Sequence, residues 1–277
     1  TAADNAIKAA ATEGLAPSKY TEKDDQKILA PAFWSSDEQN WMWGIIVSET
    51  DRVVTSGIVN WPSHMGSMSY GYANYSGGRQ INKELYEAIP NSDARKGWWL
   101  GADLKSNNLT EDQQAMMTDY GYGAYTQVKF APYKNELETS VNANDIPLMR
   151  IEEMYLIKAE AEAMGGNLSG GKSTLENFVR TYRDPSFTSK ANSAQDFQDE
   201  VWLQRRMELW GEGFSLFDIL RLKKPVIRKN TNYDPSVQYN SAAEAQILIY
   251  RIPQCEMETN SGISDTDNNP AAPQPQL

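Results

Sequence analysis

The hydrophobic pattern is clearest in Val201–Arg221, where large apolar residues recur at steps of four, three, four and three. At this spacing the following residues share one face of a helix: Leu203, Met207, Trp210, Phe214 and Phe217. Gly211 and Gly213 interrupt the run, and glycines at this place predict a tight corner between two helices. The stretch therefore predicts a packing centre built from two helices, the second ending before Pro225.

The segment before this stretch is also helical in character. A helix is predicted over Pro147–Met164, with the proline just inside its start and Gly165 and Gly166 at its end. The next predicted helix is Ser173–Tyr182. Two antiparallel helices joined by a short glycine-rich loop form a hairpin of the tetratricopeptide type. We therefore expect a mainly α protein with a helical scaffold over residues 145–225.

Residues 33–133 have a different character. Six of the eight tryptophans and eight of the fourteen tyrosines lie here, among many glycines. This composition predicts a loop-rich region with few short strands, packed against the helical hairpins. Trp41–Val47 is expected to form a short buried strand, and Asn82–Ile89 a short helix. Thr110 followed by Gln113 is typical of a capping box that starts another helix.

The two ends of the chain differ from each other. Ala2–Glu13 is alanine-rich and predicts a helix. Ile247–Ile252 is expected to be extended before a proline. Residues 261–277 have no aromatic side chain and much Pro, Asn and Asp, which predicts an irregular C-terminal tail.

Composition narrows the function classes. The 277 residues carry a net charge of -11, which disfavours nucleic acid or an anionic membrane surface as a partner. The single histidine and single cysteine exclude a multi-histidine metal site and an internal disulfide. We expect no metal and no cofactor. Because the chain starts at Thr1 without a visible signal peptide, it is expected to be a cleaved or trimmed product.

One segment matches a phosphate-binding motif. Residues 166–173 read GNLSGGKS, which fits the pattern G-x-x-x-x-G-K-[ST]. That motif requires a buried strand before the loop, whereas the preceding segment is an amphipathic helix. Ser173 with Glu176 also fits a capping box. A helix–loop–helix is therefore the favoured interpretation.

Clustered acids and arginines raise the alternative of carboxylate catalysis. Glu152 and Glu153 are adjacent, so their side chains diverge by about 100° on a helix and cannot flank one glycosidic bond. Acids accompanied by as many arginines usually form structural ion pairs. We assign such a structural role to Arg205, Arg206, Glu208, Glu212, Asp218 and Arg221.

The aromatic loops are the best candidates for a binding site. Rings among Gly, Ser and Asn suit sugars, whose C–H faces stack on aromatic rings while their hydroxyls take hydrogen bonds. The candidate residues are Trp41, Trp61, His64, Tyr70, Tyr72, Tyr75, Trp98 and Trp99. The alternative for any single ring is that it belongs to the core. His64 is the one side chain with an ordinary pKa near neutrality, and a stacking or hydrogen-bonding role is favoured over catalysis.

Several stretches, in order, resemble one known family. These are IPLMRIEEMYLIKAEAEA at residues 146–163, LENFVR at 175–180 and QRRMELWGEGFSLFDILR at 204–221. Ile252-Pro253 with Glu256, and then NNP at 268–270 with Gln274, also fit, and INKELYEAIPNSDARKGWW at 81–99 fits more loosely. Together they resemble the SusD/RagB family of outer-membrane nutrient-binding lipoproteins. The clear likeness covers about half of the chain, and the aromatic loops lie where such families vary.

This resemblance implies a single SusD-like domain over residues 1–277, with the ligand face in 33–133. It implies a lipid-anchored protein on the extracellular face of the outer membrane that binds glycans without catalysis. The glycan would pass to a SusC-like TonB-dependent transporter. Members of the family are longer, so an N-terminal part with the lipid anchor is expected to be absent from this sequence. A carboxylate-based glycoside hydrolase and a structural module without its own ligand are the alternatives.

Overall fold

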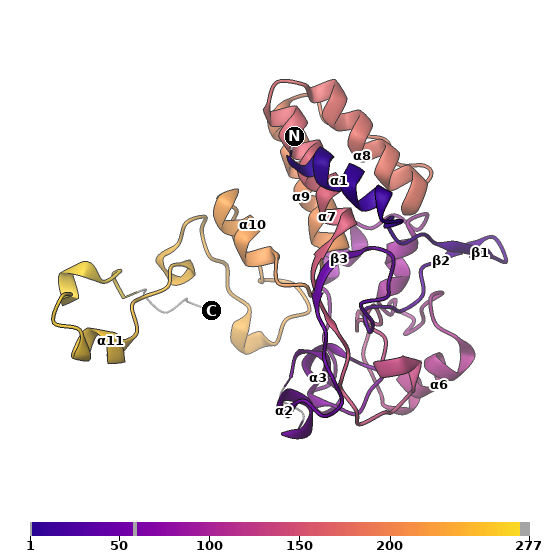
Figure 1. Ribbon diagram of the computed structural model, residues 1–277, viewed down its shortest axis with the longest axis horizontal. Helices are drawn as coiled ribbons and strands as arrows, with labels where there is room; N and C mark the ends of the chain where they lie inside the picture. Colours follow the sequence, from indigo (N-terminus) through magenta and orange to yellow (C-terminus); the bar gives the residue numbers. More distant parts are fainter. Residues whose placement is uncertain (1, 58–59, 272–277) are drawn as a thin grey trace. The chain divides into compact units, whose positions relative to one another are not determined.

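The computed structural model describes residues 2–57 and 60–271 and is mainly helical, as predicted (Figure 1). The chain forms two compact units, Thr1–Glu212 and Gly213–Leu277. Their boundary falls at the predicted glycine corner, inside the range 145–225 that was expected to form one scaffold.

Four helices form the scaffold of the first unit: α1 (Ala2–Thr12), α7 (Ile151–Met164), α8 (Leu168–Tyr182) and α9 (Ala194–Glu208). Helices α1, α8 and α9 all pack against α7, and Figure 1 shows the four side by side. Leu156, Phe178 and Phe197 are fully buried between them. An alanine Cβ in place of Gly171 would lie 2.6 Å from the carbonyl oxygen of Ala159, which shows how closely α7 and α8 approach. The predicted helical hairpin is therefore present.

Two predicted helix starts are wrong. Pro147 lies in strand β4 (Ile146–Arg150), and α7 begins only at Ile151. The reason is that β4 pairs antiparallel with β3 (Trp41–Ile45), so the residues before α7 are extended. Asn167, not Ser173, caps α8, accepting a hydrogen bond from the backbone N–H of Gly170 at 3.0 Å.

This early start of α8 removes the phosphate-loop interpretation. Residues 168–173 are helical, so their backbone N–H groups are not arranged as a loop around a phosphate. The connection between α7 and α8 is only Gly165, Gly166 and Asn167. Ser173 lies inside the helix, and the capping box predicted there is wrong.

The rest of the first unit consists of short elements joined by loops. They are β1 (Thr21–Lys23), β2 (Gln26–Ile28), β3, α2 (Arg52–Thr55), α3 (Trp61–Met65), α4 (Tyr72–Tyr75), α5 (Lys83–Glu87), η1 (Ala94–Trp98), α6 (Glu111–Asp119), η2 (Tyr133–Asn135) and β4. The capping box of Thr110 and Gln113 at the start of α6 is confirmed. The strand at Trp41 is confirmed in place, but it is not buried throughout. Trp43 and Ile45 lie on the same face of the strand and are 63% and 49% exposed.

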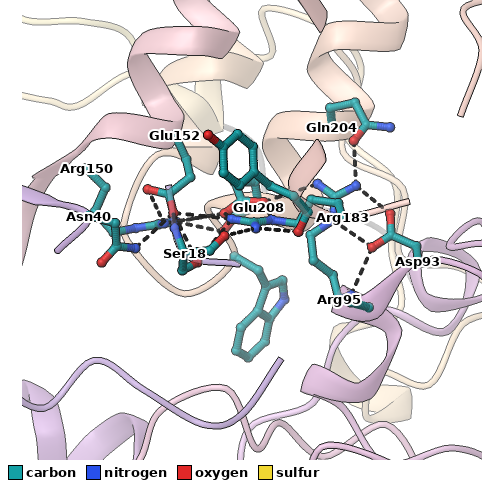
Figure 2. A network of polar contacts seen from close by, with 12 residues as sticks. Ser18, Asn40, Asp93, Arg95, Arg150, Glu152, Arg183, Gln204 and Glu208 are labelled. Atoms are coloured by element: carbon teal, nitrogen blue, oxygen red, sulfur yellow. Dashed lines mark hydrogen bonds and ion pairs between the residues drawn. The ribbon is translucent and has the colours of Figure 1, made fainter. Parts of the chain in front are cut away.

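A buried network of charged side chains joins these short elements to the helical scaffold (Figure 2). Glu208, at the end of α9, lies at its centre and is fully buried. Its carboxylate accepts hydrogen bonds from Arg183, Arg95 and Arg150 at 2.8, 3.3 and 3.4 Å. Arg183 follows α8, Arg95 is in η1 and Arg150 ends β4. One carboxylate therefore connects four elements that are distant in sequence.

The charges of this network are balanced. Its ion pairs join four cations to four anions, namely Arg95, Lys129, Arg150 and Arg183 to Asp93, Glu152, Glu208 and Glu212. Burial alone would raise the pKa of Glu208, but Arg183, Arg150 and Arg95 outweigh it and hold that pKa well below its ordinary value. Burial lowers the pKa of Lys129 to about 8 although Glu212 partly opposes the shift. Glu208 and Glu212 thus have the contacts of structural residues.

Two arginines of α9 lie beside this network. Arg205 lies 3.4 Å from the carboxylate of Glu153. The guanidinium of Arg206 lies 5.0 Å from the ring centre of Trp202. Both contacts are with protein side chains, as a structural role requires.

In the described part of the second unit, which ends at residue 271, all helices are short, and Val226 forms an isolated antiparallel bridge with Ser241. The helices are α10 (Ser215–Arg221), η3 (Pro235–Val237), η4 (Gln246–Leu248), α11 (Gln254–Thr259) and η5 (Asp265–Asp267). Asp218 and Arg221 form an ion pair at 2.8 Å, and Phe217 is 69% exposed.

Two sequence expectations fall in this second unit. The extended segment predicted at 247–252 is wrong at its start, where residues 246–248 form a 3-10 turn. In the predicted tail, residues 261–271 are irregular apart from η5. Residues 272–277 of that tail lie outside the described residues.

Gly211→Ala is expected to lower the free energy of unfolding by about 2–4 kcal/mol. Gly211 has φ +80°, and a Cβ there would lie 2.8 Å from side-chain carbons of Met65 and Phe130. Gly213→Ala is the matched control, because φ is +92° but no atom lies within 4 Å of the added carbon. Urea unfolding measures both variants. Equal losses would contradict the packing role of Gly211.

Candidate functional site

Three of the eight predicted ligand-binding rings belong to the core. Trp41, Trp98 and Trp99 are 5%, 2% and 0% exposed. Trp99 packs edge-on against Trp210 with ring centres 5.7 Å apart, and Trp41 packs beside Phe33. A ring without an exposed face cannot stack on a sugar, so these three tryptophans are removed from the site.

The fourth tryptophan has a mixed environment. Trp61 is half-buried and meets Phe130 edge-on, with ring centres 5.1 Å apart. It packs against the small core cluster of Phe33, Trp41 and Phe130. Its main contacts are therefore with the protein interior.

The remaining predicted residues are brought together at one surface. Tyr70, Tyr72 and Tyr75 are 41%, 44% and 67% exposed. Tyr70 and Tyr75 meet edge-on at 5.5 Å, and their hydroxyl groups are hydrogen-bonded to each other. His64 lies against Tyr72 with ring centres 4.4 Å apart and planes 34° apart. The His64 ring therefore lies tilted against that of Tyr72, and its role as a hydrogen-bonding or stacking group stays a prediction.

Two further residues extend this group. The guanidinium of Arg79 lies 5.8 Å from the ring centre of Tyr72. Tyr120 is 40% exposed, and its ring stacks on that of Tyr122, whose hydroxyl accepts a hydrogen bond from Asn74 of α4 at 3.2 Å. We call this set the tyrosine surface: His64, Tyr70, Tyr72, Tyr75, Arg79 and Tyr120. Its outer atoms are aromatic C–H groups, phenol hydroxyls, one imidazole and one guanidinium.

Buried polar side chains hold α3 and α4 beneath this surface. Asn60 caps α3 by accepting a hydrogen bond from Ser63 N–H at 3.0 Å. The Ser63 hydroxyl accepts one from Tyr72 N–H at 2.7 Å and thereby fixes the start of α4. A side chain at Gly71 would lie within 3.0 Å of Ser63, so only glycine permits this approach. These hydrogen bonds therefore hold in place the backbone that carries the rings.

The loop that carries Tyr70 is fixed from a distant segment. Asn142 is buried, and its amide donates to the carbonyl of Tyr70 at 3.0 Å and accepts from Ser69 at 3.3 Å. Tyr70 N–H also donates to Thr139 O at 2.9 Å. These supports were missed from the sequence because Asn142 is 72 residues away from Tyr70. Tyr120 and Arg79 were missed as well.

The described residues hold no group of three or more His, Cys, Asp or Glu side chains that could bind a metal ion. None of the helices in the described ranges is both long and apolar enough to cross a membrane. Glu152 is fully buried and paired with Arg150 and Arg183, so it cannot reach a glycosidic bond.

The sequence matches the SusD family over residues 29–270, and the chain belongs to this family. This confirms the resemblance found in the helical segments and at the chain's end. No curated protein gives a significant match to the chain.

Solved structures of the SusD superfamily share the fold. A SusD superfamily protein from Bacteroides vulgatus is 21% identical with a TM-score of 0.67, over 98% of this chain and 54% of that chain. A SusD-like carbohydrate binding protein from the same species is 23% identical with a TM-score of 0.60, over 86% and 51%. Surface glycan-binding protein A from Bacteroides thetaiotaomicron, in complex with laminarihexaose, is 15% identical with a TM-score of 0.55, over 96% and 59%. The chain thus spans about half the length of these proteins.

Proposed function

We propose that this protein binds glycans without catalysis and that the tyrosine surface is where they bind. The observation that carries the proposal is the arrangement of exposed tyrosine rings on a base fixed by buried hydrogen bonds. Rings held in place lose little conformational entropy when a sugar stacks on them. Their hydroxyls, with His64 and Arg79, supply the polar contacts that sugar hydroxyls need.

The comparisons support the same class of ligand. One structure of the same fold is a glycan-binding protein in complex with laminarihexaose, and another is described as a carbohydrate binding protein. Membership of the SusD family supports a place at the cell surface. We further propose that the protein is lipid-anchored on the outer membrane and delivers its glycan to a SusC-like TonB-dependent transporter.

Affinity electrophoresis in gels that contain single polysaccharides tests this function. The protein should be retarded by at least one polysaccharide, and the same protein should release no reducing sugar from it. Retardation by none would favour a structural module without its own ligand. Release of sugar would favour a glycoside hydrolase.

A further inference from the structure

The first unit contains a cavity that shares no residue with the tyrosine surface. Its volume is about 340 Å³, at the small end of the range for small-molecule sites. The β1–β2 hairpin, α5 and the loops on either side of η1 form its walls. Tyr86, Lys96, Gly101 and Asp103 belong to its lining.

The backbone at Gly101 lies close to two oxygen-bearing side chains. A Cβ at this position would lie 2.7 Å from Asp103 Oδ1 and 3.2 Å from Tyr86 Oη. The two oxygens therefore converge beside Gly101, where a larger side chain would displace them. A phenol can donate and accept a hydrogen bond, and a carboxylate accepts two or more. This pair suits neighbouring hydroxyl groups of a ligand.

The ring of Tyr86 is held in place from two sides. Its centre lies 5.2 Å from that of Tyr125, and the ammonium of Lys96 lies 5.0 Å from it. Lys96 Nζ also donates to the carbonyl of Ile89 at 2.7 Å. These contacts hold the ring of Tyr86 and thereby fix the position of its hydroxyl group.

The charges around the cavity nearly cancel. Lys27, Lys96 and Lys105 contribute ammonium groups, and Asp25 and Asp103 contribute carboxylates. Among the described residues, none of these five side chains forms an ion pair within 4 Å. Lys96 Nζ donates to Ile89 O, and Asp103 Oδ1 accepts from the Lys105 N–H at 3.2 Å, but a carboxylate accepts further hydrogen bonds. A lining that carries both donors and acceptors favours a neutral polyhydroxyl ligand over a phosphate or an apolar molecule.

We propose that this cavity is a second binding site, which takes a single neutral sugar residue. It does not depend on the tyrosine surface, and either site can be right without the other. Tyr86 and Asp103 recognise the sugar's hydroxyls, and glycine at position 101 allows their two oxygens to lie close together.

The test uses saturation-transfer NMR and calorimetry with glucose, galactose, mannose and N-acetylglucosamine. All titrations are made in the Tyr72→Ala/Tyr75→Ala background, so that sugar bound at the tyrosine surface does not contribute. At least one sugar should bind. Tyr86→Phe, which keeps the ring, should weaken its affinity about fivefold, and Asp103→Asn, which keeps the shape, about tenfold or more.

Two results would overturn the proposal. One is that none of the four sugars binds in this background. The other is that a sugar binds with unchanged affinity to both Tyr86→Phe and Asp103→Asn. Thermal unfolding of the two variants is the folding control. If it is unchanged, a lower affinity comes from the altered cavity and not from partial unfolding. If no polysaccharide retards the protein in affinity gels, that result counts against glycan binding at the tyrosine surface and leaves the cavity proposal unaffected.

Discussion

Glu208→Gln is expected to lower the free energy of unfolding by about 3–5 kcal/mol, a large part of the stability of a typical domain. Glu208 is fully buried, and its carboxylate lies within 3.4 Å of Arg95, Arg150 and Arg183. Glutamine keeps the shape but replaces one acceptor oxygen with a donor and removes the charge. The arginines would then be left with uncompensated positive charge in the interior.

Urea unfolding followed by tryptophan fluorescence measures this loss. Glu49→Gln is the matched control, because Glu49 pairs with Lys134 at 2.7 Å but both side chains are about half exposed. Water and salt screen an exposed pair of this kind, so its loss should lower the free energy of unfolding far less than the loss of Glu208 does. Equal losses in the two variants would contradict the structural role of the buried network.

Glu208→Gln also tests how the stability of the protein changes with pH. The folded pKa of Glu208 lies below the ordinary value of 4.5, so the unfolded protein binds more protons in acid. The stability from this carboxylate is complete above about pH 5 and is lost as the pH falls through the folded pKa. The stability gap between wild type and Glu208→Gln should therefore narrow as the pH is lowered below 4.5.

The second large effect is expected at the tyrosine surface. Tyr72→Ala/Tyr75→Ala should weaken glycan affinity at least about thirtyfold, because two stacking rings together contribute about 2–4 kcal/mol. Neither ring is buried, with Tyr72 44% and Tyr75 67% exposed, so the fold should remain stable. Tyr250→Ala is the control, since Tyr250 is 81% exposed and lies in the second unit. Calorimetry with the polysaccharide found by affinity electrophoresis measures the affinities, and an unchanged affinity in the double variant would exclude these rings.

The helical scaffold was predictable because local signals determine it. Glycines at 165, 166, 211 and 213 mark helix ends. The apolar spacing was only partly right: of its five residues, Leu203 and Met207 lie in α9, and the buried face of that helix also includes Phe197 and Val201. The network around Glu208 was only half predictable. Its acids stand out in the sequence, but Arg95 is 113 residues away from Glu208 and Arg150 is 58 away. Local sequence does not reveal pairings over such distances.

The aromatic residues show a second limit. Tryptophans and tyrosines were equally plausible as ligand contacts by composition, yet Trp98 and Trp99 are buried and Tyr72 and Tyr75 are exposed. Burial depends on which segments pack around a ring, and the sequence does not state this. One local signal did exist: Tyr72 and Tyr75 are three residues apart in a short helix, which places both on one side.

Hydroxyl-radical footprinting with mass spectrometry tests the central claim most directly. Oxidation of each side chain is compared with and without the polysaccharide that retards the protein in gels. The glycan should protect Tyr72 and Tyr75, while Tyr250 and Trp43, 81% and 63% exposed, should be oxidised as before. Undiminished oxidation of Tyr72 and Tyr75 in the saturated complex would contradict glycan binding at the tyrosine surface.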